Sequence, residues 1–155
     1  MPQQDRSFAV PQPDLSAVEW LAAAAADPAG LVRRWERDPL GVALLQVGRL
    51  WDMVLVAGAA GLSVLDRLAA RGAATGPVLA DTAGTRVGFL TPAGTAGAPF
   101  GDRARVIGSG AWLEVPHPEV AAGGSRWLVP PDGSGALTAP GLLMEAVRGV
   151  VPVQS

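Results

Sequence analysis

The sequence contains no cysteine, and it also lacks lysine, asparagine and tyrosine. Without cysteine, the chain forms no disulfide and performs no thiolate chemistry. All twelve basic residues are arginine. Because the codons of lysine, asparagine and tyrosine are AT-rich, we infer a GC-rich genome, and codon usage then explains the arginines without invoking recognition.

Long apolar runs and an excess of positive charge are missing as well. Hydrophobic residues make up 49% of the chain, but no apolar run reaches the ~18 residues that a membrane span needs. The N-terminus lacks the basic start and apolar core of a signal peptide, so we expect a cytoplasmic protein without a membrane partner. The net charge of −2 gives nucleic-acid binding no support, although a local basic patch is compatible with it.

The length of 155 residues fits one domain with its own core. We expect a flexible tail over 1–13, where prolines and glutamines leave little that could pack. A single domain is expected over 14–150, followed by a short tail over 151–155. No internal repeat and no long linker indicates a second domain.

Two helices are predicted near the start of the chain, over 14–27 and 29–37. Ser16 and Glu19 have the spacing of a capping box at the start of the first helix. Asp27 is the expected N-cap of the second. We expect the charged residues of the second helix to form a solvated face, with a phosphate-contacting face as the alternative: Arg33, Arg34, Glu36 and Arg37.

The stretch 49–61 is expected to organise the fold. Its strand Asp52–Ala57 is apolar after the first residue, which is typical of a strand covered on both faces. Gly58–Gly61 predicts a tight turn, with a phosphate cradle as the weaker alternative. A helix over 62–71 should follow, with these residues facing inward: Leu62, Leu65, Leu68 and Ala69.

The remaining chain mostly predicts short antiparallel strands. The expected elements are a hairpin of Pro77–Asp81 with Arg86–Thr91, a hairpin of Arg103–Gly108 with Trp112–Val115, and a strand Arg126–Val129. Thr138 is the expected cap of a last helix over 140–148. The fold class is therefore α/β (α+β), one domain in which a mixed, mainly antiparallel sheet packs against helices.

Several of these pieces, in this order, resemble the N-terminal domain of bacterial bifunctional DNA primase/polymerases. That domain belongs to the prim-pol branch of the archaeo-eukaryotic primase superfamily. The similarity covers about residues 27–143. It comprises the helix Asp27–Pro39, the glycine-led strand Gly41–Leu45, the central strand in Gly48–Gly61, the hairpin Val78–Pro92, and the closing segment Gly108–Pro131 with its glycine turn and Trp-Leu before a proline.

The departures from the family fall on its catalytic positions. Family members hold two divalent ions with an Asp-x-Asp pair on one face of the central strand, and those positions are here Leu55 and Ala57. Arg86 replaces the histidine of the family's hairpin, and Gly88 replaces its tyrosine. Asp52 lies an odd number of residues away and so faces the other side. The resemblance implies the primase/polymerase-like fold but not polymerase activity, because hydrocarbon does not bind magnesium.

The preferred function is therefore a catalytically inactive primase/polymerase-like domain that acts as a binding or regulatory module. We expect no catalytic residue, metal ligand or cofactor, and a partner that is another protein or a nucleotide-like ligand. One alternative is an active primase/polymerase or nucleotidyltransferase with rearranged acids. It would use magnesium or manganese and bring Asp52 within about 5 Å of Asp81 or Glu114. A second alternative is a self-associating structural protein, for which a homodimer is the candidate assembly.

Five residues are candidates for nucleotide binding because they match the family's substrate cleft or add a basic or aromatic group near it: Arg86, Trp112, His117, Arg126 and Trp127. For each of them, a role in packing or at the surface without ligand binding is the alternative. His117, the single histidine, lies between two prolines, where a surface role is common. Core packing is the alternative for Trp112 and Trp127, and it is the expectation for the other tryptophans: Trp20, Trp35 and Trp51.

Overall fold

The computed structural model describes residues 15–81, 85–120 and 124–150. The predicted tails over 1–13 and 151–155 lie outside this part of the chain. In chain order the elements are α2 (Ala17–Ala22), α3 (Pro28–Arg37), β1 (Ala43–Gln46), β2 (Trp51–Ala57), α4 (Gly58–Ala70), β3 (Val78–Asp81), β4 (Arg86–Pro92), η1 (Thr95–Gly97), η2 (Gly101–Arg103), β5 (Ala104–Ile107), β6 (Trp112–Val115), β7 (Ser125–Val129) and α5 (Pro140–Gly149).

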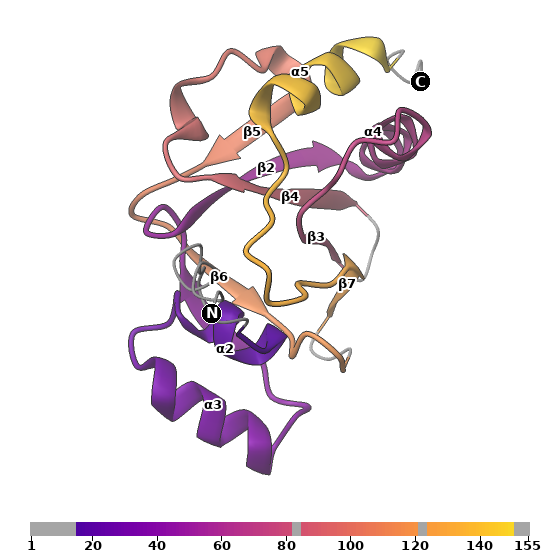
Figure 1. Cartoon of the computed structure of the whole chain (residues 1–155). Helices are drawn as coiled ribbons and strands as arrows, with labels where there is room; N and C mark the ends of the chain where they lie inside the picture. The colour runs from indigo at the N-terminus through magenta and orange to yellow at the C-terminus, as the bar shows by residue number, and fades with distance from the viewer. Residues whose placement is uncertain (1–14, 82–84, 121–123, 151–155) are drawn as a thin grey trace, which may run out of the picture.

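The strands form two antiparallel sheets. One has five strands in the order β5-β2-β4-β3-β7, and the other pairs β1 with β6. Figure 1 shows α4 and α5 at one end of the molecule and α2, α3 and β6 at the other, with the larger sheet between them. The predicted α/β class is confirmed, with every strand pair in the described residues antiparallel. No helix among these residues is long and apolar enough to cross a membrane.

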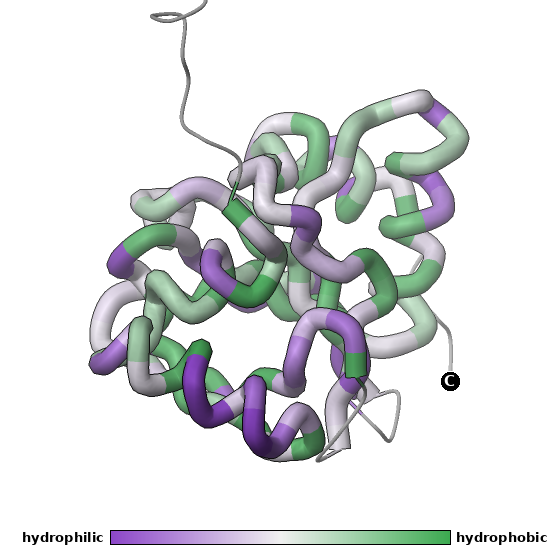
Figure 2. The backbone as a smooth tube through the Cα atoms, turned by 60° about the horizontal axis from the view of Figure 1, so that its bottom comes forward, coloured by the Kyte–Doolittle hydropathy of each residue, from purple (hydrophilic) through white to green (hydrophobic). Residues whose placement is uncertain are grey.

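Strand β2 separates two apolar cores. Trp51 and Met53 point into the core that α2, α3 and the small sheet cover, while Val54 and Val56 point into the core under α4 and α5. This alternation confirms that the strand is covered on both faces. Figure 2 shows that the strongly hydrophilic turns lie on the outside of the molecule, many of them on α3.

Local signals placed the first two helices well. Ser16 and Glu19 form both halves of the capping box, each N–H···O distance being 3.0 Å. Asp27 caps α3 by accepting a hydrogen bond from the N–H of Gly30 at 3.1 Å. Helix α2 is nevertheless much shorter than predicted. The chain leaves the helix so that the buried Ala24 can accept a hydrogen bond from Gln46 of β1 at 2.9 Å.

The prediction for Gly58–Gly61 was wrong, because these residues form the first turn of α4 rather than a turn before it. Gly61 lies against β4, where an added Cβ would be 2.6 Å from Cβ of Val87. The buried face of α4 is therefore Gly58, Gly61, Val64 and Leu68. Leu62, predicted to face inward, is 49% exposed.

The predicted hairpin of 103–108 with 112–115 was also wrong. β5 pairs with β2, and β6 pairs with β1, so the turn at Ser109 and Gly110 connects two sheets. β5 belongs beside β2 because Val106 and Ala104 then pack against the core under α4 and α5.

Thr138 does not cap the last helix. Helix α5 has Ala139 at its N-cap without a side-chain hydrogen bond. The buried Thr138 hydroxyl instead accepts a hydrogen bond from the N–H of Gly76 at 3.0 Å. This contact ties the segment before α5 to the segment before β3, 62 residues earlier in the chain.

Asp52, the polar residue of β2, has a structural partner. Its side chain is buried, and Oδ2 accepts hydrogen bonds from the N–H groups of Gly94 and Ala96 at 3.0 and 3.1 Å. These bonds hold η1 against the start of β2. Asp52 shares a face with Val54 and Val56, so the prediction that it faces away from Leu55 and Ala57 is confirmed.

The close contact of α4 with β4 predicts a difference between two glycines. Gly61→Ala should be less stable than Gly141→Ala by about 1–3 kcal/mol, because the new methyl group overpacks the site beside Val87. Gly141 is a matched control, since it is helical and has nothing within 4 Å of an added Cβ. Urea unfolding followed by tryptophan fluorescence measures the difference, and equal stabilities would contradict the packing.

The buried carboxylate of Asp52 gives a second prediction. Asp52→Ala should lower the free energy of unfolding by about 2–4 kcal/mol, because two backbone N–H groups lose a charged acceptor. Asp52→Asn should lose about half as much, since its amide oxygen still accepts. Urea unfolding of both variants is the measurement, and an Asp52→Ala protein as stable as the unchanged chain would be the contrary result.

Candidate functional site

Two adjoining hollows open around Leu55 of β2. The inner hollow, about 230 Å³, is lined by Met53, Leu55, Leu79, Asp81, Arg86, Gly88, Ile107, Leu113, Glu114 and Ser125. The edge hollow, about 280 Å³, is lined by Leu55, Val56, Ala57, Thr85, Arg86, Asp102, Arg103, Ala104 and Arg105. Leu55 and Arg86 line both, so the hollows meet at positions that the resemblance aligns with the catalytic residues of the prim-pol domain.

Strand register explains why these side chains meet. Leu55 pairs with Gly88 of β4 on one side and with Arg105 of β5 on the other. Ala57 pairs with Arg86 of β4. Directly paired residues of antiparallel strands share a face of the sheet. Arg86 and Arg105 therefore flank β2 on the face of Leu55 and Ala57, from strands each about 4.8 Å away.

The electrostatic character of the site comes from these two arginines. Both are exposed, and neither guanidinium takes part in a hydrogen bond or ion pair within the described residues. Arg103 differs, because it donates to the carbonyl oxygens of Val150 and Arg148 at 2.8 and 3.5 Å and so holds the end of α5. Asp102, on η2, is the carboxylate of the edge hollow. The guanidinium groups of Arg86 and Arg105, which have no partner among the described residues, are suited to binding an anion.

The inner hollow has an apolar floor. Met53, Leu55 and Ile107 come from β2 and β5, and Leu113 comes from β6 across the gap between the sheets. Gly88 leaves room for the Met53 side chain, since a Cβ added at Gly88 would be 2.7 Å from the Met53 sulfur. Such a floor offers contact area to an aromatic or aliphatic part of a ligand.

The acids of the enzyme alternative lie in different settings. Asp52 holds η1 on the opposite face of β2. Asp81 accepts hydrogen bonds from the N–H groups of Thr85 and Arg86 at 2.7 and 3.2 Å, which tie the end of β3 to the start of β4. Glu114 is exposed at the rim of the inner hollow. Across residues 15–81, 85–120 and 124–150, no three His, Cys, Asp or Glu residues are grouped so as to hold a metal ion.

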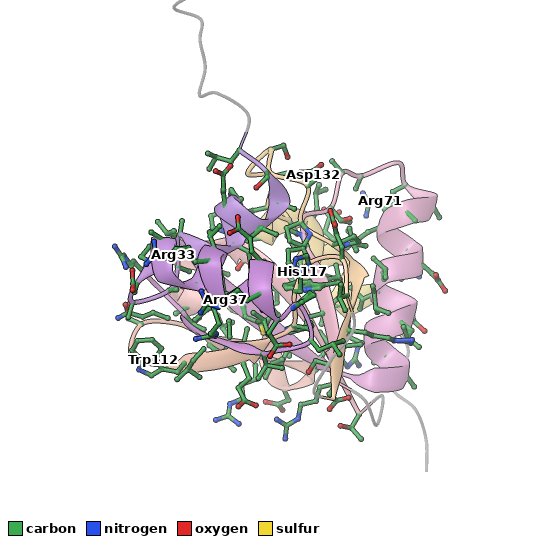
Figure 3. The ribbon with its side chains drawn as sticks, turned by 90° about the horizontal axis from the view of Figure 1, so that it is seen from below. Arg33, Arg37, Arg71, Trp112, His117 and Asp132 are labelled. Atoms are coloured by element: carbon green, nitrogen blue, oxygen red, sulfur yellow. The ribbon has the colours of Figure 1, made fainter. Side chains whose placement is uncertain are left out.

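His117 and Trp112 lie apart from the hollows. The His117 ring contacts Trp35 edge-on with centroids 5.3 Å apart, and its Nδ1 accepts a hydrogen bond from the N–H of Glu119 at 3.0 Å. Trp112 is 50% exposed at the start of β6. In Figure 3, Trp112 extends from the edge of the molecule, whereas the partly buried His117 lies near the middle of the view.

Arg126 and Trp127 lie on β7, at the far edge of the larger sheet from β5. Trp127 packs against the core that contains Trp51, and its Nε1 donates a hydrogen bond to the Pro116 carbonyl oxygen at 3.1 Å. Arg126 is exposed and lines neither hollow. Of the five predicted residues, only Arg86 lines the hollows around Leu55. The predicted core positions of Trp35 and Trp51 are confirmed, each being 1% exposed.

Arg105 is a site residue that the sequence did not reveal. Its strand was predicted to pair with 112–115, and that pairing by itself does not place Arg105 beside Leu55. Arg105 becomes a neighbour of Leu55 because β5 pairs with β2. The sequence showed an arginine in a short predicted strand, but the strand order is needed to place that arginine beside Leu55.

Comparisons with known proteins do not add to this geometry. No family model matches the chain, and neither a curated protein nor a solved structure matches it. The resemblance to the prim-pol domain rests on the order of the sequence motifs. The candidate site rests on Leu55, Ala57, Arg86 and Arg105 and on the strand register that groups them.

Proposed function

We propose that the chain is a primase/polymerase-like domain without polymerase activity, which acts as a binding module for a small anionic, nucleotide-like ligand. One observation carries the proposal. Leu55 and Ala57, at the family's metal-binding positions, share a face with the free guanidiniums of Arg86 and Arg105.

Charge supports binding without a metal ion. Two-metal phosphoryl transfer needs carboxylate oxygens around the ions, and Leu55 and Ala57 supply none. Guanidinium groups bind phosphate directly, with paired N–H donors in a planar fork. Arg86 and Arg105 would hold the phosphate groups, while the floor of the inner hollow, including Leu55 and Ile107, would receive the base or sugar.

The environments of the acids favour this proposal over an enzyme with rearranged carboxylates. Asp52 is engaged with backbone N–H groups on the other face of β2, and Asp81 with the N–H groups of Thr85 and Arg86. Asp102 and Glu114 remain at the hollows, each in a different one. An active enzyme would have to recruit these two.

Polymerase activity is expected to be absent. Purified protein with a primed DNA template, deoxynucleoside triphosphates and magnesium or manganese should give no extended primer. A functional polymerase in the same buffer is the positive control. Extension that co-purifies with the protein and falls in Asp102→Asn and Glu114→Gln variants would contradict the proposal.

Anion binding is expected to depend on the two free arginines. Titration calorimetry with ATP in EDTA should detect binding, and Arg86→Gln or Arg105→Gln should each weaken it about 10- to 100-fold. Arg126→Gln is the matched control, because Arg126 is exposed but lines neither hollow. Binding that requires magnesium, or that falls equally in all three variants, would refute the assignment.

A further inference from the structure

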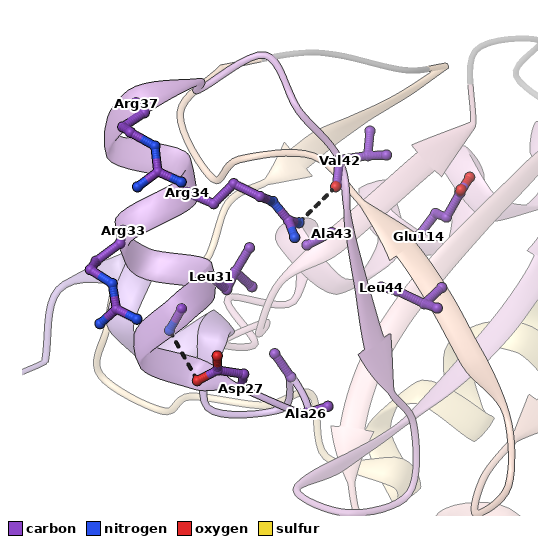
Figure 4. Close-up of a pocket in the computed structure, with 12 residues that line it drawn as sticks. Ala26, Asp27, Leu31, Arg33, Arg34, Arg37, Val42, Ala43, Leu44 and Glu114 are labelled. Carbon is purple, nitrogen blue, oxygen red and sulfur yellow. Dashed lines mark hydrogen bonds between the residues drawn. The ribbon is translucent and has the colours of Figure 1, made fainter.

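A second surface, which shares Glu114 with the inner hollow near Leu55, lies between α3 and β1. It is a groove of about 680 Å³, seen in close-up in Figure 4. We call it the α3–β1 groove; its lining residues used below are Leu31, Arg33, Arg34, Arg37, Leu44 and Glu114. Nothing in the proposed function depends on this groove.

One wall of the groove is the outer edge of β1, where Leu44 has free backbone groups between two positions that are already hydrogen-bonded. The Val47 N–H donates to the Ala111 carbonyl oxygen. The backbone N–H and C=O groups of the odd-numbered residues of β1 therefore point toward β6, and those of the even-numbered residues point away from it. On the outer edge, Gln46 N–H donates to Ala24 and Val42 C=O accepts from Arg34 at 3.2 Å. Leu44 lies between them, and neither its N–H nor its C=O has a hydrogen-bond partner in the described part of the chain.

A free edge of this kind is a template for another strand. An extended peptide that adds beside β1 would pair its backbone with the N–H and C=O of Leu44. The Leu44 side chain is 54% exposed on the same strand. It offers the peptide an apolar contact next to the backbone pairing.

The opposite wall is cationic. Arg33, Arg34 and Arg37 lie on one face of α3, since residues three and four apart are neighbours on a helix. Figure 4 shows Arg34 reaching across to Val42. Arg33 and Arg37 have no ion pair or side-chain hydrogen bond among the described residues. The carboxylates of the groove are Glu114 and the N-cap Asp27, whose Oδ1 is engaged with Gly30.

We propose that the α3–β1 groove binds an extended acidic segment of a partner protein by strand addition to β1. The backbone of the segment pairs with Leu44, its carboxylates bind Arg33 and Arg37, and its apolar side chains contact Leu31 and Leu44. A peptide fits this surface better than a nucleic acid does. The strand edge matches a peptide backbone, and none of the described residues that line the groove is aromatic and able to stack on a base.

The test uses the full chain labelled with ¹⁵N and a capped octapeptide that alternates glutamate with valine. Binding should slow hydrogen exchange at the Leu44 amide and should weaken as salt is raised. The same peptide with lysine in place of glutamate should not bind. Methylation of alternate peptide nitrogens should abolish binding without altering the protein.

Protein variants separate charge from backbone pairing. Arg33→Gln with Arg37→Gln should weaken binding by at least about twofold, while Arg49→Gln, an exposed arginine outside the groove, should not change it. Leu44→Pro removes the free N–H and should weaken binding about 3- to 10-fold, whereas Leu44→Thr keeps the N–H. Thermal melts check that each variant folds.

Several outcomes would overturn the proposal. No binding at millimolar peptide is one, and binding that tolerates backbone methylation is another. Equal binding of the lysine peptide would exclude charge recognition, and tighter binding of oligothymidine at Leu44 and Arg33 would assign the groove to nucleic acid. A concentration-dependent dimer, with the Leu44 amide protected in the absence of peptide, would identify a second copy of the chain as the occupant.

Discussion

The structure depends on the alternation of side chains along β2 between two apolar cores. Met53 belongs to one core, and its neighbour Val54 belongs to the other. Burial of both faces stabilises the strand through the hydrophobic effect and excludes unpaired polar groups from its middle. Polar chemistry is therefore confined to the two ends of the strand.

The two ends of β2 meet this constraint differently. At the start, Asp52 is buried and is tolerated because two backbone N–H groups bond its carboxylate. At the other end, Ala57 is exposed and Leu55 is partly so, and the arginines of β4 and β5 stand beside them. The start of β2 stabilises the fold through Asp52. The other end places the guanidinium groups of the arginines beside the apolar side chains of Leu55 and Ala57. That contrast is the physical basis of the proposed binding site.

The net charge of this molecule does not show how its charged side chains are distributed over the surface. The chain carries −2 overall, yet two surfaces each hold arginines that have no acidic partner among the described residues. The ion pair within the described residues joins Arg71 to Glu145 at 2.9 Å, between α4 and α5. Arg33 and Arg37 in the α3–β1 groove, like Arg86 and Arg105 around Leu55, have no side-chain partner in the described part of the chain and are available for ligands. Both proposals follow from this distribution.

The sequence by itself determined the local features and the apolar character of β2. The capping box at Ser16 and the N-cap Asp27 each depend on residues three positions apart, so local pattern was sufficient. Tertiary structure alone decided that β5 pairs with β2, that Gly61 enters the α4–β4 contact, and that Thr138 bonds Gly76. These choices join residues about 25 to 60 positions apart. They arise because the fold buries apolar faces on both sides of one sheet. The residues close to each position in the sequence do not indicate which distant segment will cover it.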